Sequence, residues 1–215
     1  MKTFRAVDVA AVVLSQNQGV FLERCIRSCL AQTFPGRFHD VIVADAGSAD
    51  FSREVIHGFG RRITPLFLEP QSTLEEAAAA GIRKATNARY VLLARAQDFL
   101  ADYTVLFQYL WLFQNHDFEG VRTDYWLVDP QTDAKLHRVP GTELSTPFGV
   151  MLRKEVFVRE GLYEAGPRRP SHLLQADWLR NYPIGHISIP FYRYHQDAGM
   201  RILDTLSSRT SQAQP

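Results

Sequence analysis

The fold is decided by residues 7–17, VDVAAVVLSQN. Residues 7–14 form an almost continuous apolar run, which is typical of a strand buried on both faces of a parallel sheet. Polar residues follow, and apolar side chains then recur at intervals of three and four, as on one face of a helix. These side chains are Phe21, Leu22, Cys25, Ile26, Cys29 and Leu30. A buried strand followed by an amphipathic helix predicts the first unit of an α/β fold.

The same alternation continues through the first half of the chain. Further strands are predicted at 41–44, 64–68 and 90–93. The expected helices run from an Asp50 or Ser52 cap to Phe59, from a capping box at Ser72–Glu75 to about Ala85, and onward from an Asp102 cap. Right-handed β-α-β units of this kind predict a mainly parallel sheet.

The second half of the chain has a different pattern. Strands at 120–128 and 135–139 flank the turn residues 130–133, which predicts a hairpin. A short strand at 148–152, a short helix at 154–160 and an extended segment at 184–192 are expected to follow. We therefore expect the C-terminal part to extend the α/β sheet.

Charge and composition exclude several classes of protein. The 215 residues include 24 Lys and Arg against 23 Asp and Glu, so the net charge of 24 − 23 = +1 argues against nonspecific nucleic-acid binding. Cys25 and Cys29 are predicted to be buried thiols in a reducing compartment, because no zinc-ligand spacing accompanies them. The longest apolar run, 105–113, has about nine residues, against roughly 20 for a transmembrane helix. With no signal peptide at residues 1–5, we expect a cytoplasmic protein.

Several segments, in order along the chain, resemble family 2 glycosyltransferases. The opening segments are VVLSQN at 12–17, FLERCIRSCLAQTFP at 21–35 and DVIVADAGSADFS at 40–52. The later segments are AGIRKATNARYVLLARAQDFL at 80–100, FGVMLRKEVFVREGLY at 148–163 and IPFYRYH at 189–195. The resemblance covers about residues 7–196, with the spacing preserved.

The resemblance implies the GT-A fold, a three-layer α/β sandwich with a mostly parallel, twisted sheet and a small antiparallel C-terminal extension. It implies one domain over residues 1–206, with a nucleotide-binding half at 1–115 and an acceptor-side half at 116–206. Residues 207–215 are expected to be a frayed polar tail.

A nucleotide-sugar donor site is implied at the carboxyl ends of the strands, where ligands bind in open parallel sheets. Asp45 keeps the aspartate with which the family contacts the base, and Ser15 and Asn17 lie in the loop after the first strand. From the residues alone, Asp45 and Asp50 could instead serve only to form a turn and a helix cap.

For the donor diphosphate, the resemblance implies Arg193 and His195, and we add Arg95, which stands in the segment where the family binds a metal. Arg95 has two interpretations. Guanidinium geometry suits a diphosphate, so Arg95 could replace a metal ion. It could instead pair with Asp98 in an inactive site, and the sequence leaves both alternatives open.

The metal-binding motif of the family, D-x-D-D, is largely missing. Residues 95–98 read Arg-Ala-Gln-Asp, so Asp98 alone remains as a residual ligand, whereas Mg²⁺ or Mn²⁺ needs several oxygen ligands. Ala46 stands where the family has a second aspartate, and Ala78 where it has an arginine. We therefore expect any nucleotide binding to depend little on a divalent metal.

The catalytic base of the family lies shortly after a G-L-Y motif, here at 161–163. Its position points to His172 as the candidate base, because an imidazole can accept a proton from a sugar hydroxyl at neutral pH. Asp177 is the nearest later acid and the second candidate. The alternative for His172 is an ordinary surface histidine.

Two function classes follow from these residues. The first is a glycosyltransferase of polysaccharide biosynthesis, which moves a sugar from a nucleotide-sugar donor to a glycan or lipid-linked acceptor. The second is a catalytically degenerate homologue that binds a glycan, a nucleotide or a partner protein. The apolar helix at 105–113 is expected to pack in the core, or to contact a protein or the inner face of a membrane.

Overall fold

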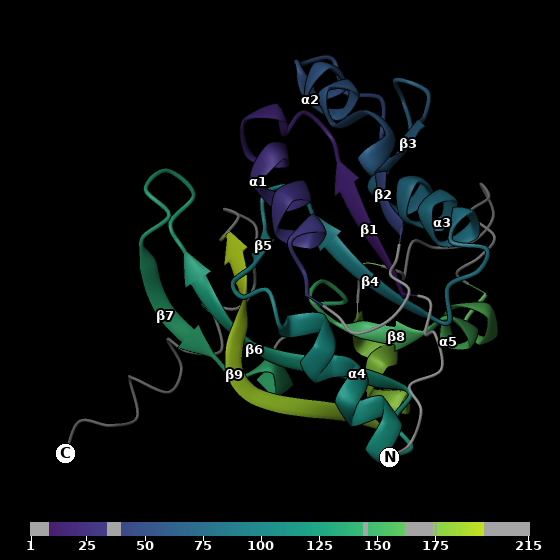
Figure 1. The fold of residues 1–215 in the computed structure, drawn as a ribbon, viewed down its shortest axis with the longest axis vertical. Coiled ribbons are helices and arrows are strands. Elements are labelled where there is room, and N and C mark those ends of the chain that lie inside the picture. The colour runs from purple at the N-terminus through teal and green to yellow at the C-terminus, as the bar shows by residue number, and fades with distance from the viewer. Residues whose placement is uncertain (1–8, 34–39, 144–145, 162–173, 175, 196–215) are drawn as a thin grey trace.

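The structure is a computed structural model, which describes residues 9–33, 40–143, 146–161, 174 and 176–195. Its first half alternates strands and helices, as the apolar periodicity predicts (Figure 1). The elements are β1 (Val9–Ser15), α1 (Gly19–Leu30), β2 (Asp40–Asp45), α2 (Ser52–Phe59), the 3-10 helix η1 (Gly60–Arg62), β3 (Thr64–Phe67), α3 (Leu74–Lys84) and β4 (Tyr90–Arg95).

The second half is built mainly from strands. Its elements are β5 (Phe99–Leu100), α4 (Val105–Asn115), β6 (Gly120–Val128), β7 (Lys135–Val139), η2 (Gly141–Glu143), β8 (Met151–Arg153), α5 (Lys154–Arg159), η3 (Ala176–Asn181) and β9 (Ile184–His195). The predicted hairpin is present, since β6 and β7 pair antiparallel.

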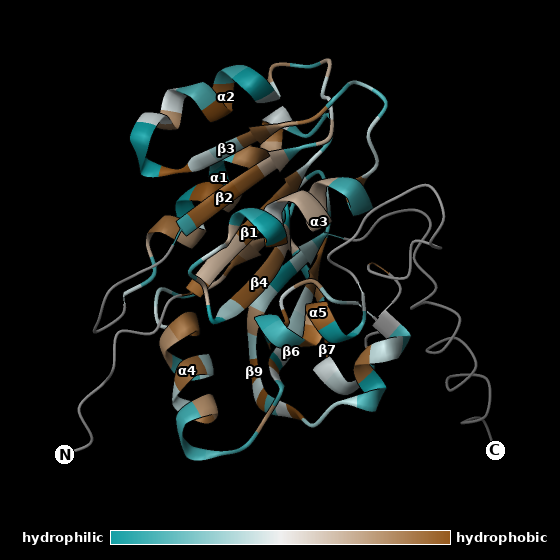
Figure 2. Cartoon of the chain, turned by 90° about the vertical axis from the view of Figure 1, so that its right-hand side faces the viewer, coloured by the Kyte–Doolittle hydropathy of each residue, from teal (hydrophilic) through white to brown (hydrophobic). Residues whose placement is uncertain are grey.

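A single mixed sheet connects the two halves, in the order β3-β2-β1-β4-β8-β6-β9-β5, with β7 paired to β6. Strands β3, β2, β1 and β4 are parallel, whereas β8 pairs antiparallel with both β4 and β6. Strands β5 and β7 also join this C-terminal extension by antiparallel pairing. The chain turns back between β3 and β4, so right-handed crossovers put α3 on the opposite face from α1 (Figures 1 and 2).

The core lies around the parallel strands, which are brown with apolar residues in Figure 2. All seven residues of β1 are buried. Helix α3 comes close to β1 because it presents the small residues Ala77–Gly81, and a Cβ at Gly81 would overlap the side chain of Val12. Cys25 and Cys29 are buried thiols in this core, as predicted.

The helix caps differ from those predicted. The capping box of α3 joins Thr73 and Glu76, one residue later than expected, because the N–H of Ser72 donates to the Glu69 carbonyl in a preceding turn. Asp102 is not the N-cap of α4; its carboxylate accepts from the N–H of Thr104, which is the N-cap. Asp50 likewise precedes the N-cap of α2, Phe51.

Strand β8 starts later than the predicted 148–152. Gly149 has a φ of +75°, in the left-handed region, so the extended backbone begins only beyond it. Phe148 forms an isolated bridge with Leu93.

Helix α4 contains the apolar run at 105–113. It buries Val105, Leu106, Tyr109, Leu110 and Phe113, while Trp111 remains 48% exposed. The part of the chain that the structure describes contains no helix with both the length and the hydropathy needed to cross a bilayer.

Candidate functional site

The carboxyl ends of β1 and β2 lie side by side at one edge of the sheet, next to the point between β1 and β4 where the strand order reverses. Ser15 and Asp45, the last residues of the two strands, are neighbours in the parallel register and are both fully buried. The Oγ of Ser15 has no hydrogen-bond partner within the described residues. This edge is the position at which open α/β sheets bind ligands.

Asp45 has a clear structural role at this edge. One of its oxygens accepts from the N–H of Ser48 at 3.0 Å, and the other accepts from the Ser48 hydroxyl. The guanidinium of Arg53 lies 3.7 Å from the same carboxylate and is 43% exposed. The turn predicted at Asp45 is therefore present, and Arg53 stands between the carboxylate and solvent.

The loop after β1 is tied to the loop after β2. Asn17 has a φ of +54°, and its side-chain oxygen accepts from the N–H of Ala49 at 2.8 Å. The N–H of Asn17 donates to the Ser48 hydroxyl at 2.8 Å, and Asp50 accepts from the N–H of Gly19 at 2.9 Å. These hydrogen bonds join the two loops, so the predicted residues Ser15, Asn17 and Asp45 lie together at one edge of the sheet.

Arg95 and Asp98, at the end of β4, form a buried ion pair with two hydrogen bonds. The Nε and Nη2 atoms of Arg95 lie 2.8 and 2.9 Å from the two oxygens of Asp98. Asp98 is fully buried, and Arg95 is 8% exposed. Arg95 therefore pairs with Asp98, as in the second of its two interpretations.

Strand β9 completes the surroundings of this pair. Asp98 also accepts from the Tyr192 hydroxyl at 3.0 Å and from the N–H of His195 at 2.9 Å, while Arg95 donates to the His195 carbonyl at 2.8 Å. The Arg95 guanidinium lies 3.8 Å from the centre of the Tyr194 ring, a cation–π distance. Burial, together with the nearby Asp98 charge, raises the pKa of Tyr192 well above its usual value, so its hydroxyl stays a donor.

A second cluster lies next to the first and joins α1 to the tip of the β6–β7 hairpin. The Nε2 atom of His195 is 2.7 Å from the Asp133 carboxylate, which also pairs with Arg24. Burial alone would raise the pKa of Asp133, but hydrogen bonds from His195 and Arg24 hold it below its usual value. Arg24 also lies over the Phe99 ring, 4.4 Å from its centre.

Arg193 makes different contacts from Arg95 and His195, the two residues with which it was grouped. Along β9, the inward-facing Tyr192 and Tyr194 contact Asp98 and Arg95, and Arg193 lies between them on the opposite face. Its guanidinium donates to the Pro190 carbonyl at 3.2 Å and lies 6.0 Å from the centre of the Trp126 ring. Arg95 and His195, by contrast, are in contact.

The residues at the end of β4 do not fit a divalent metal. The oxygens of Asp98 already accept hydrogen bonds from Arg95, Tyr192 and His195. Among the described residues, no group of three or more His, Cys, Asp and Glu side chains is arranged to hold a metal ion. A cation at this position would have to displace the guanidinium of Arg95.

The two candidate bases have different outcomes. His172 lies outside the described residues. Asp177 lies in η3, and its carboxylate is 77% exposed and 3.8 Å from the guanidinium of Arg180. Both remain predictions.

Four residues of these clusters were not among the predicted site residues: Arg24, Asp133, Tyr192 and Tyr194. Arg24 and Asp133 are 109 positions apart, so no local pattern connects them. The two tyrosines stood in the quoted IPFYRYH segment, where alternation along a strand indicated that they face the other way from Arg193.

With this geometry established, comparison with known proteins identifies the family. Residues 11–158 match the model of glycosyl transferase family 2. The chain belongs to this family. The match includes β1 to β8 and therefore contains both the Ser15–Asp45 edge and the Arg95–Asp98 pair. Among curated proteins, none matches the sequence of this family 2 chain.

Solved structures of similar fold confirm the GT-A architecture. TarS 1–349 of S. aureus in complex with UDP has a TM-score of 0.69 at 13% identity, over 89% of this chain and 61% of that one. Longer TarS has a TM-score of 0.71 at 14% identity, over 88% of this chain and 37% of that one. The mannosyltransferase PcManGT of Pyrobaculum calidifontis, in complex with GDP-Man and Mn²⁺, has a TM-score of 0.64 at 14% identity, over 97% of this chain and 62% of that one. The family 2 chain therefore spans less than two thirds of these proteins.

Proposed function

We propose that the chain transfers a sugar from a nucleotide-sugar donor to an acceptor without using a divalent metal. The proposal rests on the family match over residues 11–158, which includes the strand ends where the predicted donor residues lie. TarS and PcManGT, which share the fold, are described with UDP, UDP-GlcNAc and GDP-Man. A nucleoside diphosphate sugar is accordingly the donor class that we propose here.

In this proposal, the nucleoside binds at the edge formed by Ser15, Asn17 and Asp45. The buried Ser15 hydroxyl supports this, because it has a hydrogen bond to offer and no partner among the described residues. Asp45 would accept from the base, and Arg53 is the exposed cation beside it. Hydrogen bonds to buried, preorganised groups of this kind select a base strongly.

The diphosphate would bind at the end of β4, beside Arg95, His195 and Arg24. When the bond between sugar and phosphate breaks, the leaving diphosphate gains negative charge, and fixed cations stabilise that charge as it forms. His172 is the proposed acceptor of the proton from the attacking hydroxyl, and Asp177 is the alternative. In this scheme, side chains of the protein supply the positive charge that stabilises the leaving diphosphate.

A second candidate function is favoured by one specific observation. Arg95 already uses its Nε and Nη2 atoms on Asp98 and the His195 carbonyl, so it closes the position where a phosphate would lie. A degenerate family member with this closed site would bind a glycan, a nucleotide or a partner protein without transferring a sugar.

Calorimetry and a turnover assay with UDP, GDP and their sugar conjugates separate the two functions. A transferase binds the nucleotide and releases nucleoside diphosphate from the sugar donor; the degenerate protein shows no release. We expect Mn²⁺ to change the dissociation constant less than tenfold relative to EDTA, that is, by less than about 1.4 kcal/mol. A gain of tenfold or more would overturn metal independence, and the absence of both binding and release would overturn the proposed function.

Variants of one arginine test the diphosphate position. Arg24→Gln should weaken nucleoside diphosphate binding by about 1.5–3 kcal/mol, the range for charged hydrogen bonds. Arg61→Gln, which changes an exposed arginine of η1, is the matched control and should leave the affinity unchanged. Equal affinity of wild type and Arg24→Gln would place the diphosphate elsewhere.

A further inference from the structure

Cations and aromatic rings alternate along one face of the strand-rich half. Lys135 lies 5.4 Å from the centre of the Trp126 ring, and Arg193 lies 6.0 Å from the same ring. Arg193 pairs in register with Phe99, and Arg24 lies 4.4 Å from the centre of the Phe99 ring. We call these five residues, Lys135, Trp126, Arg193, Phe99 and Arg24, the basic–aromatic strip.

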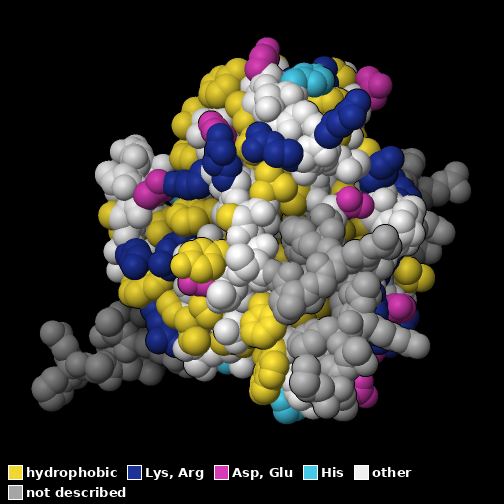
Figure 3. Space-filling model, in the orientation of Figure 1, with side chains coloured by type: hydrophobic (Ala, Val, Ile, Leu, Met, Phe, Trp, Pro, Cys, Tyr) yellow, Lys and Arg dark blue, Asp and Glu magenta, His cyan; other side chains and the backbone are white. Residues whose placement is uncertain are grey.

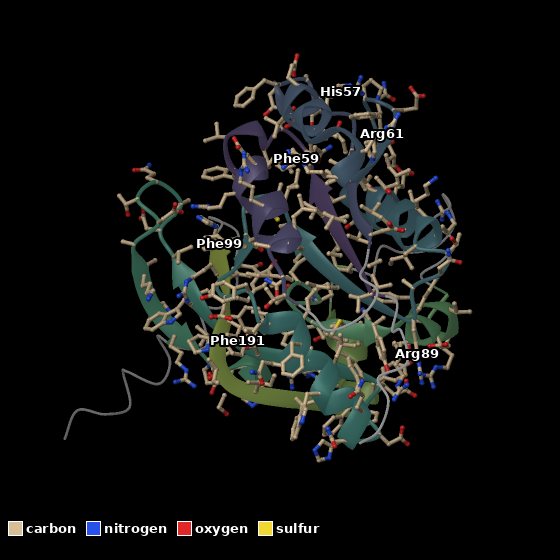
Figure 4. All side chains as sticks on the ribbon, in the orientation of Figure 1. His57, Phe59, Arg61, Arg89, Phe99 and Phe191 are labelled. Atoms are coloured by element: carbon tan, nitrogen blue, oxygen red, sulfur yellow. The ribbon has the colours of Figure 1, made fainter. Side chains whose placement is uncertain are left out.

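Five elements of the fold bring the residues of the strip together. Its residues come from α1, β5, β6, β7 and β9, and the cross-strand register sets Trp126 opposite Arg193. In Figure 3, dark-blue and yellow side chains are interleaved on the left of the molecule, over the region that Figure 1 labels β6 and β7. Figure 4 labels Phe99 on this side, far from Arg61.

The charge of the strip is only partly balanced. Arg24 pairs with Asp133, and the neighbouring Arg138 pairs with Asp124. Within the described residues, neither Lys135 nor Arg193 has a carboxylate at ion-pair distance. Lys135 is exposed, and Arg193 is partly buried. Burial lowers the pKa of Arg193, so an anion bound beside it would relieve an unfavourable environment. The strip therefore offers uncompensated positive charge beside flat apolar rings.

We infer that the basic–aromatic strip binds an anionic glycan, a sugar chain bearing carboxylate or phosphate groups. Guanidinium and ammonium groups pair with those anions, and the Trp126 and Phe99 rings offer apolar faces to the C–H faces of sugar rings. The strip leads from the hairpin to the Arg24–His195 cluster, next to the proposed diphosphate position, so this glycan is the acceptor class if the proposed transfer holds. The inference rests on the proposed function only for that last step.

Alternating cations and aromatics also suit single-stranded nucleic acid. The overall charge of +1 and the family of the chain favour the glycan. An oligonucleotide is accordingly a competing ligand in the test, and so is an anionic membrane.

The test measures binding of the full chain to polygalacturonate, neutral dextran, a poly-dT oligonucleotide and vesicles of phosphatidylcholine with phosphatidylserine. We expect binding to polygalacturonate, weakened by salt, and at least tenfold tighter than binding to dextran. Lys135→Glu with Arg193→Glu should reduce polygalacturonate binding at least tenfold. The control Arg61→Glu with Lys84→Glu makes the same charge change at exposed residues of η1 and α3, and it should bind as the wild type does.

Variants of Trp126 test the strip without changing its charge, and their melting temperatures separate a loss of binding from a loss of folding. Trp126→Ala should weaken polygalacturonate binding, and a cooperative melting transition should show that the variant is folded. Trp126→Phe should restore part of the affinity. Equal binding to dextran, tighter binding to poly-dT or vesicles, an equal loss in the control variant, or no binding to polygalacturonate would each overturn the inference. Nucleotide binding is measured on the same samples. Loss of nucleotide binding with intact polygalacturonate binding would overturn only the proposed function. Nucleotide binding without polygalacturonate binding would overturn only the glycan-binding role of the basic–aromatic strip.

Discussion

At the residue scale, the most informative contact is the pair of Arg95 and Asp98. Both side chains are buried and joined by two hydrogen bonds, so each charge compensates the other in the protein interior. Arg95→Ala leaves the Asp98 carboxylate buried without its cation, and breaking a buried pair in this way costs about 3–5 kcal/mol. We expect a loss of unfolding free energy of that size in urea denaturation.

Two further variants show whether that loss comes from the pair. Arg27→Ala breaks an exposed i,i+4 pair with Glu23, and it should cost less than about 1 kcal/mol. Arg95→Met with Asp98→Leu removes both charges and should be more stable than Arg95→Ala, since no unpaired charge remains. A loss for Arg95→Ala as small as that for Arg27→Ala would contradict the buried pair.

The residues of the site differ in how far the sequence could predict them. Asp45 and Asp98 were recognisable because each follows a buried strand, where chain connectivity places it at the ligand edge. The sequence left the pairing of Arg95 with Asp98 as one of two alternatives, because the pair is completed by β9, a strand about 100 residues further along the chain. The Arg24–Asp133 contact was not predictable, because the hairpin tip meets α1 only in the assembled fold.

At the scale of single elements, two helical glycines give opposite predictions. In α3, a Cβ at Gly81 would overlap the Val12 side chain of β1, so Gly81→Ala should destabilise the fold by about 1–3 kcal/mol through overpacking. In α2, a Cβ at Gly58 meets nothing within 4 Å, so Gly58→Ala should stabilise by about 0.5–1 kcal/mol. Thermal and urea unfolding of the two variants measure both changes. A stabilised Gly81→Ala would show that α3 does not pack closely on β1.

Elements were predicted best where local pattern and local chemistry agree. The hairpin strands β6 and β7 have the predicted bounds, because a turn segment with Pro130 and Asp133 separates the two extended segments. The predicted helix caps were wrong by one or two residues. Ser72 and Asp102 both have side chains that can cap a helix, and the turn before each helix determines whether that residue or a later one is the N-cap. The start of β8 was wrong for a backbone reason, the positive φ of Gly149.

At the scale of the whole molecule, the short strand β8 joins the parallel strands to the strand-rich half. It pairs with β4 on one side and β6 on the other. A Cβ at Gly120 would crowd the side chains of Leu152 and Ile184, so β6 comes close to its neighbours only because this position is a glycine. The proposed nucleoside position lies at the ends of β1 and β2, and three of the five residues of the basic–aromatic strip lie on β6, β7 and β9, so a close-packed junction keeps the two in a fixed relation.

The strand-rich half is itself held together by Asp124. This buried carboxylate of β6 accepts from Arg138 of β7 at 2.8 Å and from the N–H of Gly141 at 3.0 Å, and it lies 2.6 Å from His186 of β9. Burial alone would raise the pKa of Asp124, but these hydrogen bonds more than offset burial and hold it below its usual value. Asp124 therefore couples the stability of three strands to pH.

The sign of that coupling follows from the lowered pKa. A carboxyl that is more acidic in the folded protein stabilises the fold above its unfolded pKa of about 3.9, and this contribution is lost as the pH falls toward the folded pKa. At pH 7, Asp124→Asn should cost about 1.5–3 kcal/mol, the range for charged hydrogen bonds. Between pH 4 and pH 2.5 the difference in unfolding free energy between wild type and variant should shrink. Asp117→Asn, at a fully exposed aspartate, should show no such pH-dependent difference, and a gap between wild type and Asp124→Asn that stays constant on acidification would contradict this role.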